Sequence, residues 1–395
     1  MDGETAILNE TENILEGTPL TGSISQGKKY TTYKGIGGDH AIEDLNLIDE
    51  IGDNTIYATS EIDDNVHYYS FAIYNSEIKT GDGDDLYEIK NYRGKYTVGM
   101  CESEIRTGSG SDKVIIELIE DYFATTAVGL ENSEIDTGDD DDEIDIKIVS
   151  SKNEGFTSVA LASSSVSLGD GNDKFTITQK NPTKNLDVFI VNDGYAILCD
   201  FGDGDDIGNF YSEGYGIKGI EQNNHRVLLG KGDDSFTITS LYSSLYKSKI
   251  FADEGNDVIE LTASNEFHYG IEDSNIYLGN GDDILTIDSS KNSNIDGGNG
   301  IDIIKILDSS ENYIFESTQS NDLIITNSND DFFKLSLLDI ETISFDDKNI
   351  SLTGDTTAPV INNITDGRLD LKVDENIQEV YTFTANESVA WSQKN

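Results

Sequence analysis

Carboxylates and glycines gather at one recurring bend of this chain. Residues 81–85 read GDGDD, and close variants follow at 169–173 (GDGND), 230–234 (GKGDD) and 279–283 (GNGDD). Carboxylate and backbone carbonyl oxygens are ligands of hard cations, and Ca²⁺ accepts about 6 to 8 of them in loose geometry. Cys and His are absent from these bends, which disfavours softer metals. The bends therefore predict sites for a hard divalent cation.

The first glycine of the bend, which we call the central turn glycine because it lies between the two flanking strands, recurs along most of the chain. Successive copies are 27, 30, 31, 33, 28, 23, 26 and 19 residues apart. A period between about 20 and 50 residues is typical of a solenoid or another repeat array. The copies are Gly81, Gly108, Gly138, Gly169, Gly202, Gly230, Asp253 in place of glycine, Gly279 and Gly298.

An acid stands four residues after this glycine position in every copy. Apolar residues stand three residues before it and six and eight residues after it, with Gly208 as the one exception. Apolar residues at every second position on both sides of a bend predict strand, turn and strand. The nine acids are Asp85, Asp112, Asp142, Asp173, Asp206, Asp234, Asp257, Asp283 and Asp302.

A third strand is predicted further upstream in each unit. It carries a small residue followed by an aliphatic one, as in Ala72-Ile73, and a polar stretch of variable length precedes it. Variable polar stretches are typical of surface loops. A weaker copy, made of Gly35-Ile36 and the later segment EIGDNTIYA (Gly52 to Ile56), places the start of the array near residue 34.

One such unit cannot bury its apolar face alone, whereas stacked copies share a continuous core. The fold predicted for residues 34–306 is therefore an all-β, right-handed parallel β-solenoid of about ten rungs. A β-sandwich array or a propeller is the alternative, but propeller blades need about 40 or more residues and four strands. Stacking places the acids of neighbouring turns about 4.8 Å apart, where two unit charges repel by about 0.9 kcal/mol even in bulk water. A bound cation would relieve this repulsion at neutral pH.

The overall charge excludes some classes of partner. The chain has 395 residues, with 26 Lys+Arg against 76 Asp+Glu and a formal net charge of −50. Such a surface repels nucleic acid and anionic lipid and attracts cations. Because no apolar run approaches the roughly 18 residues of a membrane span, no transmembrane segment is predicted.

The bends resemble the calcium-binding nonapeptide G-G-x-G-x-D-x-U-x of the hemolysin-type, or RTX, family. The resemblance implies a parallel β-roll-like fold, calcium held between successive turns, and export by a type I system without an N-terminal signal. The matching segments are TGDGDDLYE (80–88), LGDGNDKFT (168–176), LGKGDDSFT (229–237), LGNGDDILT (278–286) and GGNGIDIIK (297–305).

In that family the motif Asp supplies carboxylate oxygen and the Gly-rich backbone supplies carbonyls. Carried over to this chain, the carboxylate ligands are the nine acids above, helped by their acidic neighbours. The full set is Asp82, Asp84, Asp85, Asp112, Asp142, Asp170, Asp173, Asp203, Asp205, Asp206, Asp233, Asp234, Asp257, Asp282, Asp283 and Asp302. The turn glycines are Gly81, Gly83, Gly169, Gly171, Gly202, Gly204, Gly230, Gly232, Gly255, Gly279, Gly281, Gly298 and Gly300.

The chain departs from the family pattern in its spacing. Family members run nonapeptides back to back, whereas here one copy occurs per unit of roughly 27 residues, so one calcium column along one edge is predicted. One ion between each stacked pair of turns gives at most about 8 Ca²⁺. The segments TGSGSDKVI, TGDDDDEID and ADEGNDVIE each lose a Gly or an acid.

The ends of the chain differ from the array. Residues 1–33 are predicted to be an N-terminal cap or lead-in. Residues 307–353 end in IETISFDDKNISL, which resembles the segment that closes hemolysin-type arrays, and are predicted to be a C-terminal β cap. Residues 354–363 read as a linker. Residues 364–395 resemble the start of a cadherin-like, Ig-type β-sandwich and stop too soon to complete one, so a fragment of a longer protein is expected.

No enzyme is predicted. Ser76 to Lys79 and the following Thr80-Gly81 imitate the boxes of serine β-lactamases, but the next two copies read SEIRTG and SEIDTG, so Lys79 is a variable outward position. The chain contains neither H-E-x-x-H nor G-x-S-x-G. Carboxylates that repeat on every rung suit a structural column better than the single cleft of a glycosidase.

These features predict a calcium-binding structural or adhesive segment of a secreted or cell-surface protein, with extracellular glycans or surface proteins as candidate partners. One alternative is the non-catalytic secretion module of an exported hydrolase. A second is a cation-buffering component of a surface layer. Catalytic motifs upstream in the full gene would favour the hydrolase, whereas further repeats and Ig-like domains would favour the adhesin.

Overall fold

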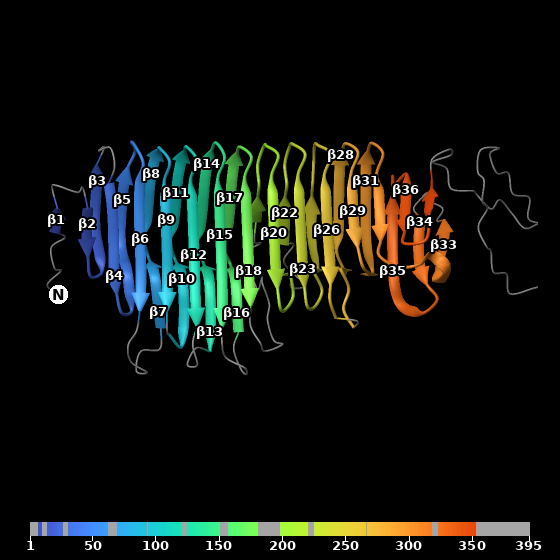
Figure 1. The fold of residues 1–395 in the computed structure, drawn as a ribbon, viewed down its shortest axis with the longest axis horizontal. Coiled ribbons are helices and arrows are strands. Elements are labelled where there is room, and N and C mark those ends of the chain that lie inside the picture. The colour runs from blue at the N-terminus through green and yellow to red at the C-terminus, as the bar shows by residue number, and fades with distance from the viewer. Residues whose placement is uncertain are drawn as a thin grey trace, which may run out of the picture.

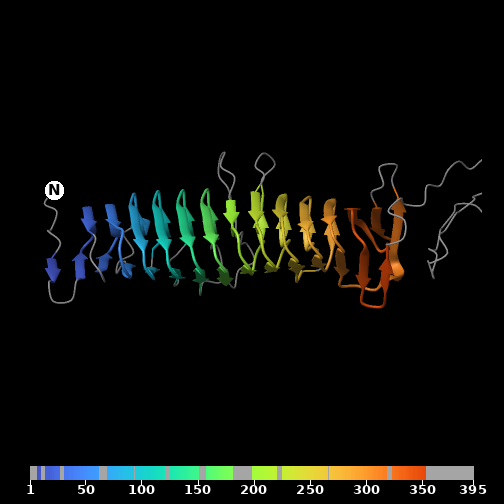
Figure 2. The same cartoon turned by 90° about the horizontal axis from the view of Figure 1, so that it is seen from above.

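Short strands stack into a long, two-layered body, and the chain advances from one end of it to the other (Figures 1 and 2). The computed structural model describes residues 7–9, 14–26, 31–61, 69–92, 94–120, 125–150, 157–180, 198–219, 225–265, 267–317 and 323–352. The predicted linker and cadherin-like segment lie outside these residues. Within them, no helix is long and apolar enough to span a bilayer.

Sheet 1 has fifteen strands in the described part of the chain, and thirteen of them, from β2 to β36, run parallel. The outermost strands β1 and β37 pair antiparallel with their neighbours. In spatial order the strands are β1 (Ile7–Asn9), β2 (Ile14–Gly17), β4 (Thr31–Gly37), β6 (Asn54–Glu61), β9 (Leu86–Tyr92), β12 (Lys113–Glu120), β15 (Glu143–Ser150), β18 (Lys174–Lys180), β20 (Ile207–Ser212), β23 (Ser235–Ser240), β26 (Val258–Ala263), β29 (Ile284–Ile287), β32 (Ile303–Ile306), β36 (Thr342–Phe345) and β37 (Asn349–Ser351).

Sheet 2 contains the strands that lead into the acidic turns and the strands just before them. The strands leading into the turns, with their neighbours at both ends, are β3 (Leu20–Gln26), β5 (His40–Asp49), β8 (Glu77–Asp82), β11 (Glu104–Ser109), β14 (Glu134–Asp139), β17 (Ser165–Asp170), β19 (Leu198–Asp200), β22 (His225–Leu228), β25 (Ser248–Phe251), β28 (Asn275–Asn280), β31 (Ser293–Asn299) and β35 (Asp330–Leu338). The preceding strands are β7 (Tyr69–Tyr74), β10 (Tyr96–Cys101), β13 (Thr126–Glu131), β16 (Thr157–Ala162), β21 (Ile217–Lys218), β24 (Leu245–Tyr246), β27 (Ile271–Glu272) and β30 (Ser290–Lys291).

These pairings confirm the predicted parallel β-solenoid. Most coils in the described residues have the three strands expected, and equivalent residues stack in register: Tyr87 pairs with Val114 and Ile78 with Ile105. The inward residues at these positions are fully buried in one continuous core. The turns between the two sheets lie along the upper edge in Figure 1, beside the labels β8 and β11.

The stack begins before residue 34. Strands β2 and β3 pair in parallel with β4 and β5, so part of the predicted lead-in forms a coil. The assignment of Gly35-Ile36 to the third-strand position was wrong, because Gly35 pairs with Ala58 in sheet 1. Ile42 holds that position instead and pairs with Ile73.

Antiparallel strands follow the last Asp-bearing coil. A short 3₁₀ turn, η1 (Ser310–Asn312), precedes β33 (Tyr313–Ser317) and β34 (Leu323–Asn327), which form a meander with β35. Strands β35 and β36 still pair in parallel with β31 and β32, so they continue both sheets by one further layer.

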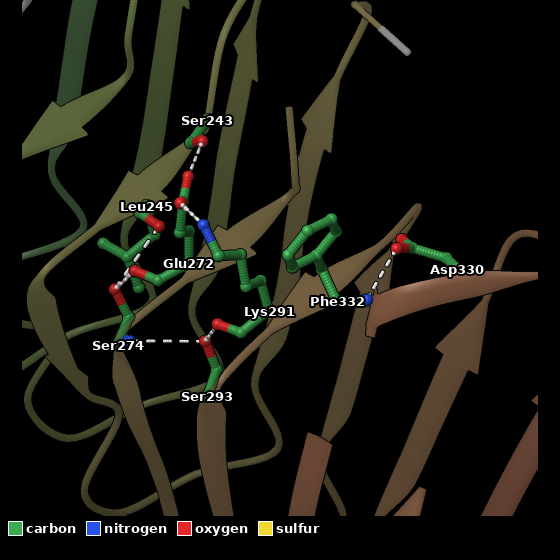
Figure 3. Close-up of polar contacts among 8 residues, drawn as sticks. All are labelled: Ser243, Leu245, Glu272, Ser274, Lys291, Ser293, Asp330 and Phe332. Carbon is green, nitrogen blue, oxygen red and sulfur yellow. Dashed lines mark hydrogen bonds and ion pairs between the residues drawn. The ribbon is translucent and has the colours of Figure 1, made fainter. Parts of the chain in front are cut away.

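A buried serine ladder marks the kink between the two strand series of sheet 2. The residue before each serine has a left-handed backbone in most coils, as at Asn75 with φ +47°. Each serine hydroxyl donates to the carbonyl two residues earlier, and all except Ser248 accept an amide from the preceding coil, as between Ser274 and Ser293 in Figure 3. The buried serines are Ser76, Ser103, Ser133, Ser164, Ser248, Ser274 and Ser293, and His225 takes this position in one coil.

The single break in the apolar pattern, Gly208, has a steric cause. Phe201 enters the core from sheet 2 beside it, with its ring centroid 5.9 Å from that of Phe236 in the next coil. A Cβ added to Gly208 would lie 2.8 Å from Phe201 Cζ and even closer to the Phe236 ring. The missing side chain at position 208 thus makes room for Phe201.

We expect Gly208→Val to destabilise the chain by about 1–3 kcal/mol, because the added side chain overpacks a filled core. Urea denaturation measures the change. Adding Phe201→Leu removes the ring atom closest to position 208 on that side and should recover part of the loss. A Gly208→Val variant as stable as the parent would contradict this account.

Candidate functional site

The nine predicted acids lie in one line at the turns between the sheets. We call Asp85, Asp112, Asp142, Asp173, Asp206, Asp234, Asp257, Asp283 and Asp302 the aspartate column. Each side chain is at most 3% exposed. Each acid follows an acidic turn and immediately precedes a sheet 1 strand, so parallel stacking places them one above another.

One carboxylate oxygen of every column residue has a defined hydrogen-bond partner. Oδ1 accepts the backbone N–H of the equivalent residue in the preceding coil, at 2.7 to 3.0 Å. The ladder starts at Asn54, whose N–H donates to Asp85, and ends at Glu341, whose Oε2 accepts the N–H of Asp302. This arrangement links neighbouring coils through side chains.

The second carboxylate oxygen has no such partner. Oδ2 of all nine column residues is buried without a hydrogen bond in the described part of the chain. Buried polar atoms are nearly always satisfied, and an unsatisfied charged one is especially unfavourable. Nine equivalent oxygens in one line are therefore candidate ligands for cations or sites for protons.

Burial also raises the pKa of the column acids above the ordinary Asp value of 3.8. Loss of hydration raises the pKa of Asp112 and Asp234 to about 8 and that of Asp173 to about 6. The pKa of Asp283 is raised by the same cause. Burial raises the pKa to about 7 at Asp85, Asp142, Asp206, Asp257 and Asp302.

Threonines face the column in three coils without satisfying it. The hydroxyls of Thr80, Thr107 and Thr137 lower the pKa of the aspartate five residues later, against the larger effect of burial. Thr107 Oγ1 nevertheless donates to Thr137 O at 2.7 Å, and Thr137 Oγ1 donates to the next coil at 2.8 Å. The free Oδ2 atoms thus stay without a donor.

The turn backbone has the conformation predicted for it. All thirteen predicted turn glycines have positive φ, from +79° at Gly81 to +158° at Gly171. Positive φ is accessible to glycine at little cost and turns backbone carbonyls in directions closed to other residues. The carbonyls after the central glycine accept amides from the preceding turn, as Lys231 O does from Gly204 N at 2.6 Å.

The acids just before the column form a separate, exposed row. Asp84 Oδ1 accepts the N–H of Ser111, and Asp205 Oδ1 accepts the N–H of Asp233, so this row bonds in the opposite direction to the column. Asp233 and Asp282 do the same for the coils that follow them. These side chains point away from the buried line.

The remaining predicted acids, Asp82, Asp170 and Asp203, are also exposed. Asp82 accepts a hydrogen bond from Ser109, and Asp203 pairs with Lys231. In the described residues, no group of three or more His, Cys, Asp or Glu side chains converges as a metal site would. The structure therefore brings the nine column acids into line and leaves the other seven outside it.

The sequence predicted a weaker copy of the turn around Asn54, but it assigned neither Asn54 nor Glu341 to the column. Both residues hold the column position in the flanking coils. A signal existed in both cases, since Ile56 and Ile343 stand two residues later at the position that is apolar after every column acid except Asp206.

The donor set fits a hard cation. Each turn offers one buried, unsatisfied carboxylate oxygen, and the same turn contains backbone carbonyl oxygens that accept amides from the neighbouring turn. Carbonyls retain a second lone pair when they accept one hydrogen bond. Ca²⁺ tolerates such an irregular all-oxygen shell better than Mg²⁺, which requires near-octahedral geometry.

The chain is similar to a solved structure of a hyperactive, Ca²⁺-dependent, β-helical antifreeze protein from an Antarctic bacterium, with 16% identity over 90% of this chain and 99% of that one and a TM-score of 0.38. At this TM-score the likeness adds nothing to the strand pairing described above. No family model matches the chain, and no curated protein does either. The resemblance to the hemolysin-type family therefore stays a prediction.

Proposed function

We propose that this chain is a calcium-stabilised β-solenoid in which Ca²⁺ ions bind along the aspartate column. The observation that carries the proposal is the line of nine buried Oδ2 atoms without a hydrogen bond. A cation shared between neighbouring turns supplies the missing partner and offsets the repulsion between stacked carboxylates. Calcium binding then contributes directly to folding free energy, because the unfolded chain has no such line of ligands.

Removal of calcium should destabilise the whole array. We expect the far-ultraviolet circular dichroism signal of β structure and the melting temperature at pH 7.5 to be higher in millimolar Ca²⁺ than in chelator. Mg²⁺ at the same ionic strength is the control for charge screening and should restore much less stability. Equal β signal and melting temperature in Ca²⁺ and in chelator would refute calcium stabilisation.

We further propose an extracellular or cell-surface location and a structural or adhesive role. The support is the elongated stack, the net charge of −50 and the dependence on a cation that is abundant outside cells. Binding of the calcium-loaded chain to an array of extracellular glycans and surface proteins tests the adhesive part. Absence of binding, together with a hydrolase domain in the full gene, would favour the secretion-module alternative.

A further inference from the structure

The first coil of the column carries two polar side chains that belong to no repeat motif. In the next three coils a threonine precedes the central glycine position and faces the column acid across the turn. Asp49 holds the threonine position in the first coil, since its neighbour Ile48 pairs with Lys79. Asn54 holds the column position, since its N–H donates to Asp85 Oδ1. In this coil the carboxylate (Asp49) therefore stands before the turn and the neutral side chain (Asn54) after it, the reverse of the order in the next coil.

Asp49 is a buried carboxylate with incomplete hydrogen bonding. Its side chain has no exposed surface. Oδ2 accepts the hydroxyl of Tyr33 at 2.7 Å, whereas Oδ1 has no partner among the described residues. An ionised carboxylate with one hydrogen bond in a dry environment needs a counter-charge.

Asn54 and Asp85 present matching free oxygens. The Asn54 Nδ2 donates to Gly52 O at 2.7 Å, which identifies Oδ1 as the atom left over. That atom is buried without a partner, as is Asp85 Oδ2 in the next coil. The Asn54 side chain also lies close enough to Asp85 to lower the pKa of its carboxyl. The coil of Asn54 and the next coil therefore supply three buried oxygens without a partner, one from each of two carboxylates and one from an amide.

We propose that Asp49, Asn54 and Asp85 bind an additional Ca²⁺ ion that closes the N-terminal end of the column. This inference rests on calcium binding by the column and adds a site outside the recurring motif. Two carboxylates and an amide oxygen are typical Ca²⁺ ligands, and Mg²⁺ would require a more regular shell. In this coil the carboxylate ligand comes from Asp49, at the end of the strand before the turn, and not from the column position after it.

Calcium stoichiometry of the full chain, measured by equilibrium dialysis or isothermal titration calorimetry, tests this site. Asp49→Thr introduces the residue that the three following coils have at this position, so the turn accommodates it. We expect this variant to bind one ion fewer than the parent. Adding Asn54→Asp recreates the threonine and aspartate pair of the next coil and should restore the ion.

The matched control is Asp53→Asn, which removes one charge from an exposed side chain in the same turn and should leave the number of bound ions unchanged.

Asp49→Thr should also lower the melting temperature in Ca²⁺ and raise it in chelator, a pair of opposite shifts that a purely structural role would not produce. Should Asp49→Thr fail to fold, Asp49→Asn keeps the shape and the Tyr33 bond and should weaken one site at least about tenfold.

The outcomes separate this site from the column itself. A parent chain that binds no Ca²⁺ refutes both proposals. A parent chain that binds Ca²⁺ while Asp49→Thr and Asp49→Asn each bind the same number with the same affinity refutes only the additional site.

Discussion

In chelator, the melting temperature of the chain should fall by more than about 10 °C as the pH rises from 5 to 8. Burial raises the pKa of eight column acids from 3.8 to between about 6 and about 8, with Asp112 and Asp234 the highest, and it also raises the pKa of Asp283. The folded chain therefore holds protons that the unfolded chain has already released in this window. Stability is fully present below about pH 4 and is lost as the pH rises through the folded-state values.

Calcium should reverse this dependence. The cation and the proton compete for the same Oδ2 atoms, and the cation wins as the pH rises because it needs the ionised carboxylate. In millimolar Ca²⁺ the melting temperature at pH 8 should therefore exceed that at pH 5. Thermal melts monitored by circular dichroism at pH 5 and pH 8, each in Ca²⁺ and in chelator, give the four melting temperatures to compare.

Two variants identify the column as the source of this behaviour. Asp234→Asn keeps an oxygen to accept the amide of Asp206 but cannot ionise, so it should reduce the pH slope in chelator. Asp84→Asn changes a side chain in the exposed row of acids just before the column and should leave the dependence of melting temperature on pH unchanged. Identical slopes in Ca²⁺ and in chelator would mean that the column binds no calcium in competition with protons.

The position of the column could be predicted because it depends on spacing alone. Apolar residues at every second position fix which side chains face the core, and register follows from the constant distance between glycine and acid. Column residues such as Asp112 and Asp257 lie where that spacing placed them. The direction of the hydrogen bonds could not be predicted, because it depends on backbone orientation that spacing does not encode.

Other features were hidden by residue type. Serine before a strand suggests an exposed turn, yet Ser76 and Ser103 are buried because each bonds both its own strand and the neighbouring coil. Asp49 and Asn54 do not match the repeat motif, because here the acid precedes the turn and the column position after the turn holds an amide. Phe201 explains Gly208 only once the stacked neighbours are known.

Alanine at a central turn glycine should be among the most damaging substitutions in the chain. Gly230 has φ +104°, a conformation that costs a residue with a side chain about 1–3 kcal/mol. A Cβ there would also fall well inside contact distance of the Gly202 carbonyl in the preceding turn. The turns can separate only by stretching the ladder between Asp206 and Asp234. We therefore expect Gly230→Ala to lower stability by more than about 3 kcal/mol and to weaken calcium binding at the neighbouring turns.

Two further substitutions distinguish turn geometry from a general effect of alanine. Gly38→Ala places its Cβ in open space and should change stability by no more than about 0.5 kcal/mol. Asp253 already occupies the central position of its turn with φ +70°, so Asp253→Gly relieves strain and should leave stability unchanged or higher. Urea denaturation in Ca²⁺ ranks the three variants. A Gly230→Ala chain as stable as Gly38→Ala would show that the stacked turns can part freely, and the close packing needed for shared cations would then be wrong.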